Sequence, residues 1–136
     1  MKEAIKQAKK AAAIGDVPIG CVIVEDDKII ARAYNQRNKK KTTLAHAELL
    51  AIQKASKKVN DWRLEDCTMY ITLEPCQMCA GALYWSQISK IVYGASDEHR
   101  GYRVMGGKLH PKTEVVSGVM SNECSSLMKD FFKKRR

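Results

Sequence analysis

The spacing of apolar residues along the chain switches several times between the period of a helix and that of a strand. Apolar residues three or four positions apart predict helices, whereas short runs rich in β-branched and aromatic residues predict strands. The predicted helices cover residues 2–14, 45–58, 76–85 and a last stretch that begins at Ser121. The predicted strands cover residues 20–25, 28–34, 67–73, 90–94 and 113–117.

Polar and glycine-rich segments separate these elements. Asp26 and Asp27 fit a tight turn, which makes the first two strands a hairpin. Residues 35–42 form a basic loop, after which Thr43 can cap the second helix. Residues 96–112 are rich in glycine and are expected to form a long loop.

The order of these elements predicts an α/β fold. Strands connected through helices favour parallel neighbours, so we expect a five-stranded mixed sheet with helices on both faces, a three-layer α/β/α arrangement. In such folds the crossovers place catalytic groups at strand ends, where helix N-termini point into a crevice. A chain of 136 residues has room for one compact core, which predicts a single domain over residues 1–136.

Composition narrows the class of protein. Hydrophobic residues make up 45% and charged residues 29%, which is typical of a globular domain and argues against disorder. The longest uncharged run, residues 75–89, includes Gln and Ser and is too short for a membrane span, so no membrane partner is expected. Residues 2–10 are rich in Lys and lack the apolar segment of a secretory signal, which predicts a cytoplasmic protein.

The charge of the chain is unevenly distributed. The 24 Lys and Arg against 15 Asp and Glu give a net charge of +9, with the excess near the two ends. Two basic runs, residues 37–41 and 133–136, could bind a polyanion such as a nucleic acid. The alternative is a lysine-rich face that only contacts water.

Five cysteines, an odd number, argue against a disulfide framework and leave metal binding or burial as explanations. Cys76 and Cys79, three residues apart, share a face in the first turn of a predicted helix, while His46 and Glu48 open another. The partial positive charge of a helix N-terminus favours thiolates, which bind zinc. His46, Cys76 and Cys79 supply three ligands, which leaves a position for water, as in catalytic zinc sites. Glu48 can then act as general acid and base.

Each motif also has a simpler interpretation. A Cys-x-x-Cys pair occurs in redox centres and in structural zinc sites, and Cys67 as a fourth ligand would make the site structural. Cys21 and Cys67 are expected to pack in the core. His99 and His110 are expected to be loop residues rather than ligands. Aromatic residues that we expect in the core or in a dimer contact are Trp62, Tyr84 and Trp85.

The His-x-Glu and Pro-Cys-x-x-Cys motifs occur together, a combination found in zinc-dependent base deaminases. On these motifs the chain resembles the cytidine deaminase superfamily, and most closely the bacterial tRNA-specific adenosine deaminases. The resemblance runs nearly end to end. It is carried by residues 15–20, 45–48, 62–66, 70–82, 93–95 and 130–132.

The resemblance implies a cytidine deaminase-like fold and a hydrolase that converts adenosine to inosine at the wobble position of a tRNA anticodon stem-loop, releasing ammonia. It further implies a cytoplasmic homodimer with one Zn2+ per chain. His46, Cys76 and Cys79 match the zinc ligands of the family, and Glu48 matches the residue that moves the proton.

The resemblance also suggests residues that contact the substrate. Asn35 and the backbone of Ala47 match contacts to the base, Asp97 matches a residue of the substrate loop, and Phe132 matches an aromatic near the bound RNA. The chain departs from the family pattern over residues 96–107, where the usual Gly-Ala-Ala-Gly-Ser stretch is missing.

Two other functions remain open at this point. A deaminase of a free base or nucleoside, of the guanine or cytosine type, would use the same metal centre. A non-catalytic RNA-binding module stabilised by zinc is the second alternative, against which Glu48 argues because a structural site needs no proton carrier.

Overall fold

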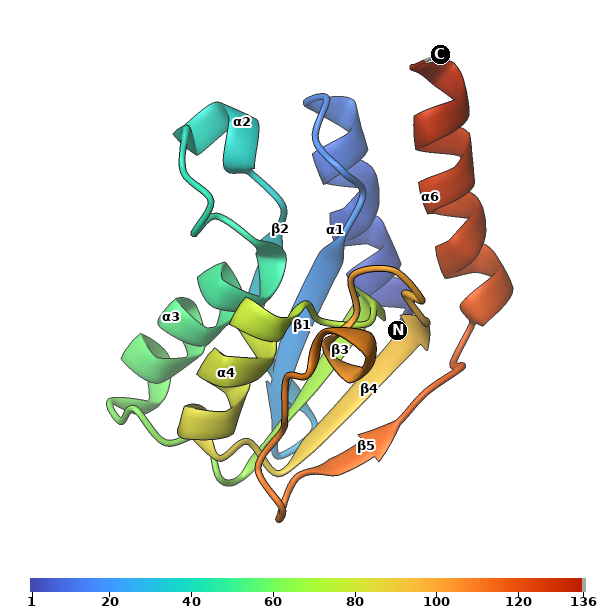
Figure 1. Cartoon of the computed structure of the whole chain (residues 1–136). Helices are drawn as coiled ribbons and strands as arrows, with labels where there is room; N and C mark the ends of the chain where they lie inside the picture. The colour runs from blue at the N-terminus through green and yellow to red at the C-terminus, as the bar shows by residue number, and fades with distance from the viewer. Residues whose placement is uncertain (136) are drawn as a thin grey trace.

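A computed structural model describes residues 1–135 of the chain, so Arg136 of the C-terminal basic run lies outside the described residues. The chain forms a central sheet with helices on both faces (Figure 1). The strands are β1 Gly20–Glu25, β2 Lys28–Tyr34, β3 Cys67–Leu73, β4 Lys90–Ala95 and β5 Glu114–Val116. The helices are α1 Lys2–Ala13, α2 Arg37–Lys40, α3 Ala47–Val59, α4 Gln77–Ser86, α5 Tyr102–Met105 and α6 Ser121–Lys134.

The sheet has five strands in the order β2-β1-β3-β4-β5. β1 runs antiparallel to both β2 and β3, whereas β3, β4 and β5 run parallel. The parallel pairs are those whose strands follow one another through a crossover, because a chain must cross the sheet face before it can enter a parallel strand. The predicted five-stranded mixed sheet is therefore confirmed.

The helices divide between the two faces of the sheet. α3 and α4 cover one face, with α3 packed on β1 and β2, while α1 and α6 cover the other, packed on β1 and β4. Figure 1 shows α3 and α4 side by side with their first turns near the same edge of the sheet. The three-layer α/β/α arrangement is confirmed.

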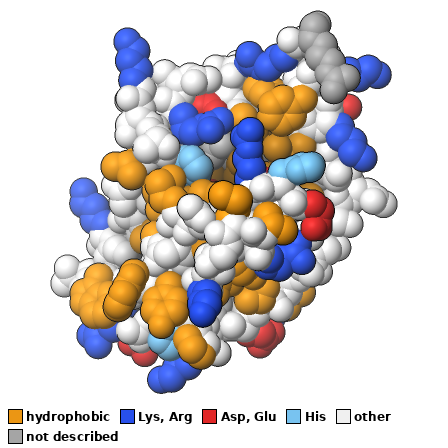
Figure 2. Space-filling model, in the orientation of Figure 1, with side chains coloured by type: hydrophobic (Ala, Val, Ile, Leu, Met, Phe, Trp, Pro, Cys, Tyr) orange, Lys and Arg blue, Asp and Glu red, His pale blue; other side chains and the backbone are white. Residues whose placement is uncertain are grey.

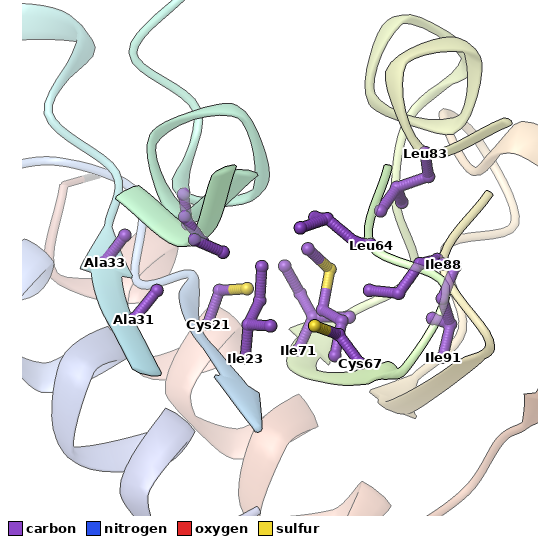
Figure 3. Packing of buried hydrophobic residues seen from close by; sticks show 14 of the residues in the cluster. Cys21, Ile23, Ala31, Ala33, Leu64, Cys67, Ile71, Leu83, Ile88 and Ile91 are labelled. Carbon is purple, nitrogen blue, oxygen red and sulfur yellow. The ribbon is translucent and has the colours of Figure 1, made fainter. Parts of the chain in front are cut away.

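The main core lies between the sheet and the pair α3 and α4. Its largest members are fully buried, and Figure 3 shows Ile23, Ile71 and Ile91 of the sheet together with Leu64 and Leu83 of the same cluster. Two free cysteines that were expected to be buried, Cys21 and Cys67, belong to this cluster and are 0% and 1% exposed.

Two short helices lie in segments that the sequence predicts as loops. α2, at Arg37–Lys40, falls within the basic segment 35–42, and α5, at Tyr102–Met105, falls within the glycine-rich segment 96–112. A helix of four residues is too short to show an apolar period in the sequence. Both α2 and α5 therefore depend on contacts with the rest of the fold. The predicted helix cap at Thr43 is also wrong, because His46 is the N-cap residue of α3.

Two large aromatic side chains lie at the surface rather than in the core. Trp62 is 61% exposed and Trp85 is 71% exposed, and Tyr84 packs edge-on against Trp85. Of the two expectations for Trp62 and Trp85, core or dimer contact, the first is therefore wrong and the second stays a prediction. Within residues 1–135, no helix has the length and apolar character needed to cross a bilayer.

Candidate active site

The structure brings together the three side chains with metal-ligand chemistry. The Nδ1 atom of His46 lies 3.7 Å from Sγ of Cys76 and 3.5 Å from Sγ of Cys79. All three ligand atoms lie within 4.8 Å of one another, which is close enough to share one ion. In the described part of the chain, residues 1–135, no further His, Cys, Asp or Glu joins this group.

The starts of two helices position these side chains. His46 and Cys76 are the N-cap residues of α3 and α4, and both have extended backbone angles. Their carbonyls accept the first helical hydrogen bonds, from Leu50 N–H at 3.0 Å and Ala80 N–H at 2.8 Å. The positive ends of both helix dipoles therefore face the cluster and favour a negatively charged sulfur.

The electrostatics of the cluster agree with this geometry. Hydrogen bonding with Cys79 and with His46 lowers the pKa of the Cys76 thiol to about 4, against the opposing effect of burial. Hydrogen bonding with Cys76 and burial hold the pKa of Cys79 far above its usual range, and hydrogen bonding to Cys76 raises that of His46. One thiolate thus shares its charge with two neighbours, an arrangement that a divalent cation would stabilise further.

The donor set fits zinc. One imidazole nitrogen and two sulfurs are ligands that zinc prefers, and three protein ligands leave a position for water. Cys67 is not a fourth ligand, because its sulfur lies in the core 4.0 Å from Oε2 of Glu25 and outside the group. The alternative of a closed structural site with Cys67 is therefore excluded.

Glu48 is the unusual carboxylate of the site. It lies in the first turn of α3, is 3% exposed, and its Oε1 has no hydrogen-bond partner. Burial raises the pKa of this carboxyl to about 7. A carboxyl with such a pKa gains and loses a proton near neutral pH, which is the property required of a general acid and base.

His46, Glu48 and Cys76 line a cavity of about 600 Å³. Arg37 of α2 also lines it, together with the segment that follows β4 and the outer part of α6. Figure 2 shows Lys and Arg side chains gathered over the upper part of the face where α2 and the end of α6 lie. The cavity is large enough for a nucleobase, and basic side chains of Arg37, Arg100 and Lys129 are among those that line it.

Asn35 and Ala47 form a buried pair beside the cavity. Asn35 is 1% exposed and lines the cavity, and its Oδ1 accepts the N–H of Ala47 at 2.8 Å. This bond satisfies a backbone donor at the start of α3 that has no partner within the helix. Ala47 is fully buried and lies one residue before Glu48, so Asn35 also fixes the turn that carries the carboxylate.

Asp97 and Phe132 lie at the rim of the cavity. Asp97 Oδ1 accepts the backbone N–H groups of His99 at 3.0 Å and Arg100 at 2.9 Å, which closes a tight turn. Phe132 extends from α6 and is 48% exposed. Both residues therefore border the cavity that His46, Glu48 and Cys76 also line.

Sequence reasoning missed a second buried carboxylate. The side chain of Glu74 is 0% exposed and pairs with Arg103 of α5 at 2.8 Å. Burial raises the pKa of Glu74, but hydrogen bonds from Arg103 and from backbone N–H groups outweigh it and leave the pKa below its usual value. The one available signal was a charged residue between Leu73 and Pro75, where an apolar strand ends.

Comparison with known proteins finds that the chain is similar to deaminases. The family model of the MafB19-like deaminases matches residues 1–136. A tRNA-specific adenosine deaminase of Bacillus subtilis (strain 168) is 46% identical over 142 residues, covering 100% of this chain and 88% of the relative.

Solved structures agree with the sequence relatives. A structure from a study of A-to-I editing by tRNA:A34 deaminases superposes with a TM-score of 0.85 at 33% identity, covering 93% of this chain and 96% of that one. A guanine deaminase of Bacillus subtilis superposes with a TM-score of 0.68 at 40% identity, covering 70% of this chain and 61% of that one.

Fold, donor set and buried carboxylate together define a base deaminase, with the His, Cys, Cys and Glu arrangement found in the zinc-dependent members of that class. The chain belongs to the MafB19-like deaminases, among the tRNA-specific adenosine deaminases of the cytidine deaminase superfamily. The resemblance inferred from the sequence motifs is confirmed.

Proposed function

We propose that this chain catalyses the zinc-dependent hydrolysis of adenosine to inosine at the wobble position of tRNA, with release of ammonia, through one deaminase domain over residues 1–136. The observation that carries the proposal is the buried carboxyl of Glu48, whose Oε1 has no hydrogen-bond partner, beside the three-donor cluster and lining a cavity that opens to the surface. This substrate is supported by the relatives, which are named as deaminases of adenosine in tRNA.

His46, Cys76 and Cys79 would hold one Zn2+ per chain, because their ligand atoms already lie within 4.8 Å of one another. When bound, zinc lowers the pKa of a water molecule toward about 7 and so supplies a nucleophile at neutral pH. The buried Oε1 of Glu48 has no hydrogen-bond partner, which leaves it available to such a water molecule.

Glu48 carries the proton transfers. With a pKa raised to about 7 it can take a proton from the attacking water and pass it to N1 of the adenine ring. The carboxylate then takes the proton of the new hydroxyl group at C6 and delivers it to the 6-amino group, which leaves as ammonia while C6 becomes the carbonyl of inosine. Because burial shields the carboxyl from bulk solvent, the proton stays between Glu48 and the substrate.

The remaining site residues would bind the base. Asn35 supplies a fixed amide at the cavity wall, and the backbone of Ala47 lies beside it, although its N–H already donates to Asn35. Asp97 and Phe132 border the entrance, where the neighbouring nucleotides of the anticodon loop would lie. A base in the duplex or stack must flip out to reach such a cavity.

We also propose a cytoplasmic homodimer that binds the anticodon stem-loop. The exposed Trp62 and Trp85 support a protein contact, since large aromatic side chains are enriched in interfaces. Sedimentation at micromolar concentration is expected to give a dimer. Sedimentation as a monomer under these conditions would contradict that part of the proposal.

A free-base deaminase is the second candidate. It is supported by the likeness to the Bacillus subtilis guanine deaminase, which shares 40% identity over 70% of this chain. The net charge of +9 favours RNA instead, because phosphate contacts require positive charge.

The deciding experiment supplies the purified, zinc-loaded protein with an anticodon stem-loop bearing a wobble adenosine. Matched reactions contain the same stem-loop with a wobble guanosine, free adenosine, free guanine or free cytosine. We expect inosine and ammonia in equal amounts from the wobble-adenosine stem-loop, at a rate that falls steeply with salt. Ammonia from free guanine or cytosine, without inosine from the stem-loop, would favour the second candidate.

A further inference from the structure

A bidentate ion pair joins α5 to the end of β3. Nη2 of Arg103 lies 2.8 Å from Oε1 of Glu74, and Nε donates to Oε2 at 3.1 Å. The Glu74 side chain is 0% exposed, whereas that of Arg103 is 45% exposed. A planar guanidinium that engages both carboxylate oxygens fixes orientation as well as distance.

The same carboxylate holds the backbone of the cavity rim. Glu74 Oε1 accepts the N–H of Asp97 at 3.1 Å, and Oε2 accepts the N–H of Arg103 at 3.2 Å. Gly101 lies against the carboxylate so closely that a Cβ atom there would overlap it. The close approach alone requires a glycine at this position. The backbone conformation does not require one, because any residue can adopt a φ of −64°.

The segment held in this way borders both the cavity and the ligand cluster. Residues 97–100 line the cavity, and the N–H of Tyr102 donates to the carbonyl of Pro75 at 2.9 Å, one residue before Cys76. Cys76 also forms an isolated bridge with Gly101. The pair therefore connects the rim of the cavity to the strand end that presents a metal ligand.

Residues 96–107 are also where the sequence departs from the pattern of its family. Without Arg103, the buried carboxylate of Glu74 would keep only two backbone donors, which compensate its charge incompletely. Residues 97–101 contribute no side chain to the apolar core clusters, so this segment is attached through polar contacts, of which those to the Glu74 carboxylate are one set and the backbone contacts to Pro75 and Cys76 are the other.

We propose that Arg103 is a positioning residue which, by locking Glu74, holds residues 97–101 over the cavity and thereby sets the affinity for the substrate. The part of this inference that concerns substrate rests on the proposed function. The attachment itself does not, since it is a property of the free protein. A direct contact between Arg103 and an RNA phosphate is the competing explanation, because its side chain is partly exposed.

The kinetic test compares R103A and R103K with R32A. Arg32 of β2 donates to Glu3 at 3.1 Å, so R32A removes the same charge from an exposed pair outside the cavity lining. With the wobble-adenosine stem-loop, R103A is expected to raise KM about tenfold and to change kcat less than about twofold. R103K is expected to recover only part of the affinity, because an ammonium cannot engage both oxygens. R32A is expected to behave as the parent.

Salt dependence separates positioning from phosphate binding. A lost phosphate contact lowers the slope of log affinity against log salt by about one, whereas a displaced rim leaves the slope unchanged. An unchanged slope with R103A supports the proposal. A slope reduced by about one, together with full recovery by R103K, would overturn it.

Hydrogen exchange tests the attachment without any activity. In zinc-loaded R103A, the backbone amides of residues 97–103 are expected to exchange faster than in the parent, while those of R32A stay unchanged and zinc content remains equal. Unchanged exchange in R103A would overturn the inference. If the parent protein does not deaminate the stem-loop, the proposed function fails, and hydrogen exchange still decides whether Arg103 holds the rim.

Discussion

The ligand cluster and the cavity rim are built in opposite ways. His46 and Cys76 begin long helices whose positions the sheet fixes, and Cys79 and Glu48 are almost fully buried. The rim consists of α2, the segment after β4 and the outer part of α6, which is half exposed where Phe132 lies. Two helices packed on the sheet thus hold the proposed catalytic groups, whereas the proposed substrate contacts at the rim come from a short helix, a loop and the end of α6.

Buried carboxylates compensate for the irregular structure of the rim. The side chain of Asp16, 0% exposed, accepts the N–H groups of Val17 at 2.8 Å and Asn38 at 3.1 Å, and lies 3.5 Å from Nη2 of Arg37. Glu74 does the same for the segment after β4. Two of the three rim segments, α2 and the segment after β4, are therefore each attached through one buried carboxylate and one arginine. Such attachments can change with the loop sequence while the catalytic centre stays the same.

The strongest test of this division removes a metal ligand. Cys79→Ala is expected to lower zinc content from about one per chain to nearly none and to abolish deamination, because two ligands do not retain the ion. Cys67→Ala removes an equally buried sulfur from the core outside the cluster. It is expected to keep the zinc. Metal analysis by mass spectrometry and an ammonia assay measure both variants.

Comparable zinc in both variants would show that the ion lies elsewhere. Loss of zinc in both, with lowered thermal stability, would mean that burial rather than ligation determines zinc content. Either result would remove the basis for separating the ligand cluster from the rest of the molecule.

The second test keeps the zinc and removes the proton carrier. Glu48→Ala is expected to bind about one zinc per chain and to lower kcat by about 10³-fold or more, since a general acid and base contributes on that scale. Glu123→Ala, at an exposed position of α6, serves as the control and is expected to retain full activity. Single-turnover rates on the stem-loop measure the effect. Activity of Glu48→Ala near that of the control would contradict the role of this carboxyl.

Much of the ligand cluster could be predicted from the sequence because its causes are local. The three-residue spacing of Cys76 and Cys79 fixes their shared helix face, and His46 precedes an apolar helical period. The strands were equally predictable, since Ile23, Met69 and Ile71 lie in short β-branched runs. Only the meeting of the two helix starts needed the family resemblance or the structure.

The rim could not be predicted, because its causes are not local. Glu74 and Arg103 are 29 positions apart in sequence and follow no period, so nothing marks them as partners. α2 and α5 contain four residues each and have no apolar face that would identify them. The same reason explains the misplaced cap at Thr43, since the preceding loop continues three residues further and ends at His46.

The smallest expected effect belongs to the outer rim, at Phe132. Its ring lines the cavity mouth, whereas the adjacent Phe131 contacts the guanidinium of Arg135 at 4.4 Å and does not line the cavity. If Phe132 stacks on a nucleotide, Phe132→Ala removes about 1–3 kcal/mol of binding. KM for the stem-loop then rises about tenfold with kcat unchanged, and Phe131→Ala leaves both constants near those of the parent. A fall in kcat with unchanged KM would instead show that Phe132 acts in the chemical step. Phe132 of α6 would then belong with the ligand cluster and not with the rim.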